Sequence, residues 1–450
     1  MYQKLVAIII IALFSLSLRG QTPINIMTVD QSTYKLWQEK NWKQLLKEGN
    51  DALEQGIDFY YLRVRMGIAS YERKNYHQAI QHFEKARKFN NQEEYVTEYL
   101  YHAYIFGGRP EEAKKLASTF SETMKVATSN LRKPFIRELQ LYYSTDVSSN
   151  PTTTANYQTH TDTVVSGTQY VANNHQIFHL GLTHDIGSSF SLHHGYTYIN
   201  QHYFLYRQND TIRLMNPEYI TNSHQYFITG QIRLARNWNL GLGMHYIMIR
   251  FPLEQMRPGM GPGAQRSSVG KDQDFSLFLH LKKHFPYLTA GGSFYYSTLS
   301  NDRQIQVDLK LSTYPLGNTN LYTHTIVSWQ QETSSGTPVK RVLLNQEMGG
   351  KLCNHLWIEG FGTFGNISNY LSDDGQVVFN EGNLISLRAG TRLIIPINNK
   401  ISFRLEYAFS KHKSVFYPNN FEDVTYNPIF YNIHSITGGL IWNLSKPARY

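Results

Sequence analysis

The chain has 450 residues, a formal net charge of +9 and a mean hydropathy of -0.42. This low mean hydropathy excludes a polytopic helical membrane protein, which needs repeated apolar runs of about 20 residues. Charged residues make up 17% and aromatic residues 14%, with 32 Tyr against 6 Trp, which argues against wholesale disorder. The modest basic excess does not indicate a nucleic-acid partner. The single cysteine, Cys353, excludes an internal disulfide framework and a multi-thiolate metal site.

The amino terminus has the layout of a secretory signal peptide. A short basic start ending at Lys4 precedes the apolar stretch 5–18, and small or polar residues follow at 19–21. This order predicts export, with residues 1–20 removed near Gly20, although Leu18 departs from the small residue usual three positions before the cut. The stretch is short for an anchor helix that spans a membrane. No cysteine lies near the cut, so a lipoprotein is excluded.

Residues 30–130 read as helices, and their spacing becomes specific between residues 60 and 93. Small residues at Gly67, Ala79 and Ala86 allow two antiparallel helices to pack closely, while Tyr76 and Phe83 fill the space between them. This pattern resembles a tetratricopeptide repeat, whose period is 34 residues. The same spacing matches Leu100 and Ala113 after it, and more weakly Asn41, Trp42, Leu45 and Ala52 before it.

The repeats depart from the family pattern at Arg63, where Trp is usual, and at Asn91, where Pro is usual. About three repeats are therefore expected, the first degenerate; an unrelated bundle of helical hairpins is the alternative. The resemblance implies a concave surface that binds a peptide or another protein, although the same tyrosines would also serve for packing between repeats. By family position that surface includes Tyr61, Tyr71, Glu72, Tyr95, Glu98 and His102.

After Pro134 the helical period gives way to alternation at period two. In 401–410 the apolar residues, such as Phe403 and Leu405, alternate with polar ones, such as Arg404 and Glu406. Such alternation fits any half-buried antiparallel sheet, including a soluble sandwich. About fourteen strands are expected, near 138–146, 175–185, 189–206, 222–235, 238–251, 273–284, 287–299, 302–313, 319–331, 339–352, 355–367, 382–396, 400–412 and 430–444.

The connections between these strands favour a membrane barrel over a sandwich. Every second connection is a short turn, as at 187–188, 236–237, 285–286, 315–317, 353–354 and 398–399. The others are mostly long and polar: 147–174, 207–221, 252–272, 368–381 and 413–429, with shorter ones at 300–301 and 332–338. Short turns on one side and long loops on the other are typical of an outer-membrane β-barrel, here expected over residues 138–450. The expected fold is thus an α + β multidomain chain, with periplasmic helical repeats before the barrel.

The last expected strand resembles the signal that the barrel-assembly machinery reads. Its polar residue, glycine, aromatic residue and hydrophobic residue are Thr437, Gly439, Trp442 and Leu444. A six-residue tail follows, where many barrels stop. The abundant Tyr and Phe residues gain a role as well, because amphipathic rings favour the two membrane interfaces. The membrane partners expected are therefore outer-membrane lipid and the assembly machinery.

The expected inward face of the barrel is rich in charge. Its basic members are Arg233, Lys282, Lys310, Arg341, Arg388, Arg392 and Arg404, and its acidic members are Asp308, Glu347, Glu359 and Glu406. In one interpretation opposite charges pair across a filled lumen. In the other, the basic excess lines a water-filled path that favours anions. Trp357 and Phe361, also expected to face inward, would narrow such a path.

No catalytic, cofactor or metal site is expected. His193 and His194 are adjacent and point to opposite faces of a strand, so they cannot bind one metal together. His280 and His284, with Asp272 and Asp274 nearby, are interpreted as hydrated lumen or interface residues. The motifs H-E-x-x-H and G-x-S-x-G and a phosphate-binding glycine loop are absent from the sequence. Two acids in the loop 368–381, Asp373 and Asp374, would sit at the outer rim and serve there as candidates for a hydrolase, or form a solvated turn.

The order of signal peptide, helical repeats and barrel resembles YaiO-type outer-membrane proteins and, less closely, repeat-plus-barrel exopolysaccharide exporters. Those exporters usually carry more repeats and a larger barrel. The resemblance implies a non-enzymatic outer-membrane barrel whose periplasmic repeats recruit an unknown protein or polymer, in surface-polymer export or envelope assembly. A passive or anion-favouring channel is the alternative, and a hydrolase at the barrel rim is the third.

Overall fold

The structure is a computed structural model. It describes residues 25–128, 135–149, 167–208, 213–234, 237–254, 267–334, 337–380, 382–418 and 428–444. The expected signal peptide, residues 1–20, lies outside this described part. The chain divides into two compact units, Met1–Leu116 and Ala117–Tyr450. None of the described helices is long and apolar enough to cross a membrane.

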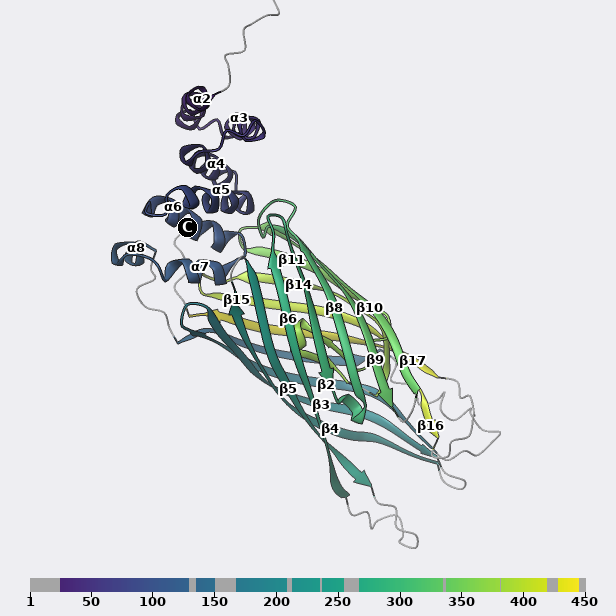
Figure 1. Cartoon of the computed structure of the whole chain (residues 1–450). Coiled ribbons are helices and arrows are strands. Elements are labelled where there is room, and N and C mark those ends of the chain that lie inside the picture. The colour runs from purple at the N-terminus through teal and green to yellow at the C-terminus, as the bar shows by residue number, and fades with distance from the viewer. Residues whose placement is uncertain are drawn as a thin grey trace, which may run out of the picture. The chain divides into compact units, whose positions relative to one another are not determined.

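The described amino-terminal part is helical (Figure 1). Its helices are α2 (Ile26–Gln38), α3 (Trp42–Glu54), α4 (Tyr60–Glu72), α5 (Tyr76–Phe89), α6 (Glu94–Phe106), α7 (Pro110–Ala117) and α8 (Glu122–Ala127). Asparagine caps open several of them; the Asn75 side chain, for example, accepts a hydrogen bond from the backbone N–H of Gln78 at the start of α5 (3.2 Å). Successive helices contact each other along the chain, so α2–α3 and α4–α5 form hairpins, and α6 packs on α5.

The helices repeat with the 34-residue period expected from the sequence. Helices α2, α4 and α6 begin at residues 26, 60 and 94, and helices α3, α5 and α7 begin at residues 42, 76 and 110. The turns repeat as well, because Lys40, Lys74 and Gly108 all have a positive φ. Each such turn is followed by the same backbone bond; in the second, the N–H of Asn75 donates to Ser70 O (2.9 Å). The repeat is therefore visible in geometry even where its residues differ.

Small residues let the helices of a hairpin approach closely. A Cβ atom added to Gly67 on α4 would lie 2.5 Å from the Phe83 ring on α5, so only glycine admits that ring. Met66, Ala79 and Phe83 are fully buried, and so is Leu45, the equivalent of Ala79 one repeat earlier. Leu45, Ala79 and Phe83 are among the positions that the sequence predicts for the close packing of the helices.

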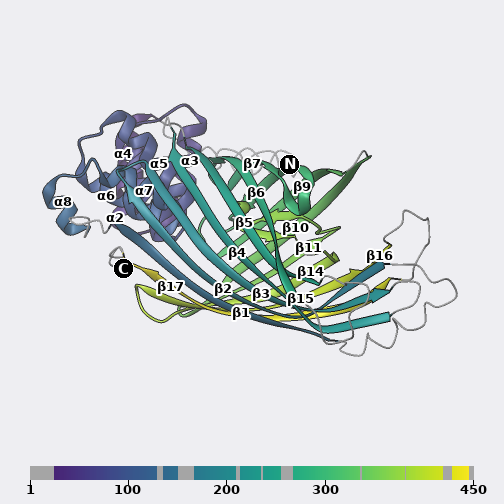
Figure 2. The ribbon, with the colours of Figure 1, turned by 90° about the horizontal axis from the view of Figure 1, so that it is seen from below.

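After the helices, fourteen of the described strands form a closed antiparallel barrel, as expected (Figures 1 and 2). The barrel strands are β1 (Ile136–Ser148), β2 (Gly167–Ile186), β3 (Phe190–Gln208), β4 (Arg213–Arg233), β5 (Trp238–Glu254), β6 (Ser267–His284), β7 (Leu288–Ser297), β8 (Arg303–Thr313), β9 (Leu321–Ser334), β10 (Thr337–Cys353), β11 (Leu356–Phe364), β14 (Leu384–Pro396), β15 (Ile401–Ser414) and β17 (Ile429–Asn443). Each pairs with its neighbour along the chain, and β17 pairs with β1 to close the ring. A three-residue strand, β16 (Phe416–Pro418), pairs with the start of β2.

Several strands run further than the sequence predicts. Of the segments expected as loops, residues 207–208 and 213–221 belong to strands β3 and β4, and residues 252–254 and 267–272 belong to β5 and β6. These extensions are paired, with register shifts near 172–174 and 203–205; Gly167 pairs with Gln208, and Leu253 pairs with Ser268. The hydrogen bonds between neighbouring strands are made by backbone groups. A segment with polar side chains can therefore continue a strand where both faces of the strand are in contact with water. Most of the other long loops, at 147–174 and 413–429, lie outside the described residues.

One face of every barrel strand points outward and is predominantly apolar. On β5 the exposed outward side chains are Leu242, Met244 and Tyr246, and on β6 they are Phe275, Leu277, Leu279 and Leu281. The alternate positions point inward and are polar and buried; Ser276 and His280 on β6 are less than 5% exposed. The barrel is therefore an inside-out fold, apolar outside and polar inside.

The first and last strands meet along a seam that contains the expected assembly signal. Gly439 lies directly opposite Tyr142 on β1, whose ring occupies the space where a Cβ atom of residue 439 would be. Thr437 Oγ1 donates to Ser144 Oγ (2.7 Å) on the same inward face. Trp442 points outward and is 44% exposed, and the N–H of Leu444 donates to Arg137 O (2.8 Å). The four residues are thus placed at the closing seam; their reading by the assembly machinery stays a prediction.

Candidate functional site: a hairpin inside the barrel

The connection between β11 and β14 folds into the barrel. It carries two short strands, β12 (Tyr370–Ser372) and β13 (Val377–Phe379), which pair with each other around the single turn η2 (Asp373–Gly375). All three residues of that turn have a positive φ, which makes the tip of the hairpin tight. We call residues 367–379 the lumen hairpin.

Apolar side chains pack the lumen hairpin against the inner wall on two sides. Leu371, which is fully buried, belongs to a cluster with wall residues of β4 to β7: Phe227, Ile247, Phe278 and Tyr295. On the other side, Ile367 and Tyr370 pack with Leu343 of β10 and Ile385 of β14. The lumen therefore contains small hydrophobic cores of its own.

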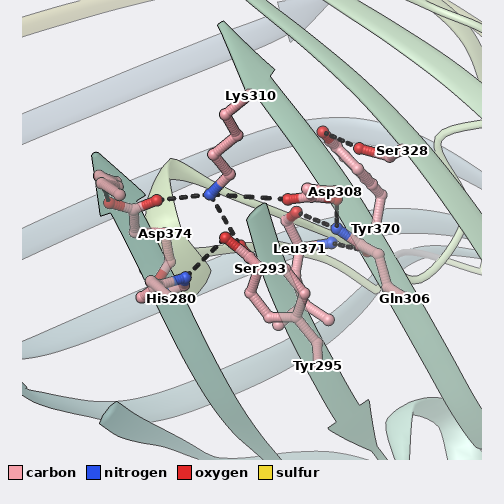
Figure 3. Close-up of polar contacts among 11 residues, drawn as sticks. His280, Ser293, Tyr295, Gln306, Asp308, Lys310, Ser328, Tyr370, Leu371 and Asp374 are labelled. Carbon is pink, nitrogen blue, oxygen red and sulfur yellow. Dashed lines mark hydrogen bonds and ion pairs between the residues drawn. The ribbon is translucent and has the colours of Figure 1, made fainter. Parts of the chain in front are cut away.

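Glutamine side chains on the wall bind the backbone of the lumen hairpin, as Figure 3 shows for Gln306. Gln306 donates from Nε2 to Leu371 O (2.8 Å) and accepts from Leu371 N (3.1 Å). Gln304 and Gln330 both donate to Asn369 O, at 2.7 and 2.8 Å. A primary amide has the same donor and acceptor groups as a peptide. These glutamines therefore act as a partner strand for the edge of the hairpin.

The tip of the hairpin is held by charge. Asp374 forms ion pairs with Lys282 on β6 (2.6 Å) and Lys310 on β8 (2.5 Å), as Figure 3 shows for Lys310. Lys310 also lies 3.7 Å from Asp308, which is 2% exposed. A hydrogen bond joins the backbone oxygen of Asp374 to His280 Nε2 (3.0 Å). The three side chains Asp374, Lys282 and Lys310 form what we call the tip latch.

The tip also reaches other parts of the wall. Gly375 O is hydrogen-bonded to His245 Nδ1 on β5 (2.9 Å), and Gln376 Nε2 is 3.1 Å from His179 Nε2 on β2. The hairpin leaves the wall between β11 and β14, yet it contacts β2, β5, β6, β8 and β9. It therefore crosses the lumen from one side to the other.

The expected position of Asp373 and Asp374 at the outer rim was wrong. Asp374 lies inside the barrel and is committed to two lysines of the wall, which leaves no rim site for a hydrolase built on this pair. The loop 368–381 looks polar on average, but its apolar residues, Tyr370, Leu371 and Val378, find partners on the inner wall. One feature of the sequence could have indicated a segment inside the barrel. Uncharged polar residues, Gln304, Gln306 and Gln330, occupy inward positions on two neighbouring strands.

A second cluster of charge lines the wall of β10, β11, β14 and β15. Arg392 contacts Glu347 (3.2 Å), Glu359 (2.5 Å) and Glu406 (2.8 Å). Glu406 also pairs with Arg388 (2.8 Å) and lies 3.7 Å from Arg404. Most of the lumen charges named from the sequence are thus members of this cluster or of the tip latch. Two basic residues lie elsewhere. Arg341 pairs with Glu332, and Arg233 is the last residue of β4, whose N–H donates to Ser189 O (2.9 Å).

The two histidines considered for a metal site, His280 and His284, are each hydrogen-bonded to a hydroxyl group. His280 Nδ1 is hydrogen-bonded to Ser293 Oγ (2.7 Å), and His284 Nδ1 to Thr289 Oγ1 (2.8 Å). Asp274 accepts from the N–H of Ser300 (3.1 Å), away from both. No group of three or more His, Cys, Asp or Glu side chains suited to a metal is found in the described part of the chain.

The residues expected on the concave repeat surface lie on α4 and α6. Tyr61 and Tyr95 are 61% and 46% exposed. Tyr71 is less exposed and packs edge-on against Tyr99, which in turn contacts Tyr95 (5.0 Å between ring centroids in each pair). His102 lies 3.9 Å from Glu98 one turn away. The structure thus gives Tyr71 the packing role and leaves Tyr61 and Tyr95 open to solvent; Glu72, at the end of α4, is also exposed.

No family model and no curated protein matches the sequence. Among solved structures, the toluene transporter TodX of Pseudomonas putida is similar, with a TM-score of 0.41 and 7% identity over 72% of this chain and 93% of that one. A FadL homologue of Pseudomonas aeruginosa gives 0.40 and 7% over 68% and 90%, and a bacterial polysaccharide outer-membrane secretin gives 0.36 and 11% over 70% and 100%. We draw no functional conclusion from likenesses of this size.

Proposed function

We propose that the chain is a non-enzymatic outer-membrane β-barrel, closed inside by its own hairpin, whose helical repeats lie in the periplasm and bind a protein or polymer partner. The observation that carries the membrane part is the outward face. A closed barrel with leucine, methionine and aromatic side chains exposed on strand after strand would aggregate in water, and it is stabilised by lipid. The even number of strands returns both ends of the barrel to its short-turn side.

The single cysteine gives a direct test of this placement. Cys353 is exposed and is the last residue of β10, next to the turn into β11 at the short-turn end of the barrel. A membrane-impermeant maleimide should label it only after the outer membrane of cells has been permeabilised. A Cys353→Ser variant is the control for specificity. Labelling of Cys353 in intact cells would contradict the proposed orientation.

The proposal of partner binding is supported by the exposed aromatic residues of the repeats. Exposed tyrosines at the equivalent positions Tyr61 and Tyr95, one repeat apart, offer large contact area at low entropic cost. Envelope material captured on the full-length protein should lose a bound protein or polymer when both are changed to Ser. Phe89, 53% exposed on α5, provides a matched control when changed to Ser. Equal capture by all three proteins would refute the repeat surface as the binding site. The resemblance to YaiO-type proteins and to polymer exporters stays a resemblance.

A channel is the second candidate, and the way in which the hairpin is held favours a gated one. Its backbone is bound by amide side chains and its tip by the latch, and each of these contacts is exchangeable for water. The basic residues that would attract anions, such as Lys310 and Arg392, are in ion pairs. A passive anion-favouring pore is therefore not the function that this arrangement supports.

A further inference from the structure

The outward faces of several strands carry basic residues toward the long-loop end of the barrel; β5 and β6 continue a few residues beyond theirs. The basic residues continue the same outward alternation as the apolar side chains below them. They are Arg250 on β5, Lys271 on β6, Arg303 on β8, Lys340 on β10, and Lys411 and Lys413 on β15. All are exposed except Lys413, which is half-buried. We call these six residues the basic rim.

The basic rim follows an aromatic level in a fixed order. On β5 the outward residues run from Leu242 through Tyr246 to Arg250, and on β15 from Leu405 through Tyr407 to Lys411. Aromatic and basic positions are four residues apart, which is about 13 Å along a strand. The order of aliphatic, aromatic and cationic side chains matches the hydrocarbon core, the interface and the headgroup level of a membrane leaflet.

Several cations of the rim are placed beside each other. Arg250 lies directly opposite Lys271 in the β5–β6 ladder, and Lys411 and Lys413 share one face of β15. Like charges opposite each other in a sheet are destabilising. Within the described residues no ion pair involves any of the six. An external anion bound there would relieve this repulsion.

The opposite end of the barrel has no comparable band. On the outward faces near the short turns the described strands end mainly in apolar residues, among them Trp238, Leu288, Leu352 and Trp442. Lys283 on β6 is the basic residue of this level, and its Nζ lies over the rings of Trp238 and Phe285 (5.0 and 5.1 Å to the centroids). The excess of cations thus belongs to one leaflet.

We propose that the basic rim binds the phosphate groups of an anionic glycolipid in the outer leaflet. This inference rests on the proposed function, because it needs the barrel to span the membrane with its long loops outside. Phosphate oxygens would sit between Arg250 and Lys271 and beside Lys411 and Lys413, while the acyl chains lie on the aliphatic belt below. Guanidinium and ammonium groups are the usual partners of phosphate.

The test uses the full chain reconstituted into zwitterionic phosphatidylcholine vesicles. A bis-phosphorylated glycolipid and its enzymatically dephosphorylated form are added separately, and the fraction retained on the repurified protein is measured. The wild type should retain the phosphorylated form preferentially. Arg250→Gln with Lys271→Gln should lower that preference by about tenfold or more, since each cation near an anionic surface contributes on the order of 1 kcal/mol. Lys411→Gln with Lys413→Gln should act likewise, and Lys283→Gln should not.

The outcomes separate this inference from the function on which it rests. Equal retention of the two glycolipids by wild type inserted in the vesicles would overturn the basic rim as a phosphate site and leave the membrane barrel standing. Unchanged preference in both double variants would also overturn it. Failure of the wild type to insert into vesicles would instead refute the membrane barrel. Competition by inorganic phosphate alone at equal concentration would contradict a lipid as the ligand, and Arg250→Lys should retain the preference.

Discussion

Asp374 is the residue on which the closed state of the lumen depends most. It is the shared anion of Lys282 and Lys310, and Lys310 is only 10% exposed in its side chain. An ammonium group held away from water needs such a partner, because an uncompensated buried charge is costly. Lys310 retains Asp308 at 3.7 Å, whereas Lys282 has no second acid within the described ion pairs. Removal of the Asp374 charge therefore affects the β6 side of the latch more.

We expect Asp374→Asn to lower the stability of the inserted hairpin by about 1–3 kcal/mol, near the lower value because Asp374 and Lys282 are partly hydrated. In planar bilayers this variant should show conductance events more often than the wild type does. Asp373→Asn is the matched control, because this neighbouring acid is exposed. Equal frequencies of conductance events in the two variants would contradict a role of the tip latch in holding the hairpin.

The helical unit contains a pH-sensitive contact of its own. His82 is buried, and burial lowers its pKa to about 4; Arg63 Nη1 lies 3.3 Å from its Nδ1. Arg63 also binds Asp58, and this hydrogen bond lowers the pKa of the Asp58 carboxyl. Both groups release protons more readily in the folded state than in the unfolded state. Acid therefore favours unfolding of the repeats.

The sign of this linkage gives a measurable window. An unfolded histidine binds a proton near pH 6.5, whereas folded His82 does so near pH 4, so stability is lost as pH falls from about 6.5 to about 4. Between pH 6.5 and 5 the loss is at most about 2 kcal/mol. Melting of the full chain, followed by helical circular dichroism, should move to lower temperature over this range. His82→Gln should flatten the dependence, and an equally steep dependence in that variant would point to another group.

Among the elements, the closing seam between β1 and β17 has the strictest steric demand. The Tyr142 ring lies over Gly439, and Arg404 stacks over that ring from β15 (5.7 Å to the centroid). A side chain at residue 439 would push the ring away and disturb the pairing of the last strand with the first. Closure is the step that removes the exposed edges of a barrel sheet.

Gly439→Ala should therefore reduce the yield of folded barrel, measured as the fraction that keeps its compact mobility on an unheated gel. Overpacking of this kind costs about 1–3 kcal/mol. Gly360→Ala on β11 is the control, because a Cβ atom there meets nothing within 4 Å. Recovery of yield by a second change, Tyr142→Ala, would support the steric explanation, and equal yields from Gly439→Ala and Gly360→Ala would contradict it.

The lumen hairpin is the element that sequence reasoning did not find. Its strands have three residues each, too short for periodicity to be detected, and its tip of Asp373, Asp374 and Gly375 reads as an ordinary polar turn. What places it inside is complementarity with distant residues: Gln306 lies 65 positions from Leu371, and His179 lies 197 positions from Gln376. Such contacts are not encoded locally. The alternating strands and the 34-residue helical period were predictable because each is a local pattern.

For the whole molecule, the fold could be predicted from the sequence, but the pairing of the charges inside the barrel could not. The sequence identified most of the lumen charges and left open whether they pair or line a path. The structure places Arg392 among three glutamates and Asp374 between two lysines, which favours pairing. The hairpin crosses the remaining space and contacts wall strands on several sides. Part of the chain's own backbone thus occupies the interior of the barrel.

The most direct test of this account is the conductance of the wild type against a variant in which residues 367–381 are replaced by a short Gly-Ser turn, in planar bilayers. This change removes the hairpin and keeps the wall strands β11 and β14. Fourteen strands enclose more space than an eight-stranded barrel, whose side chains fill it. We predict large, stable conductance steps for the variant and a closed baseline for the wild type. Wild-type steps as large as those of the variant would contradict the closed lumen.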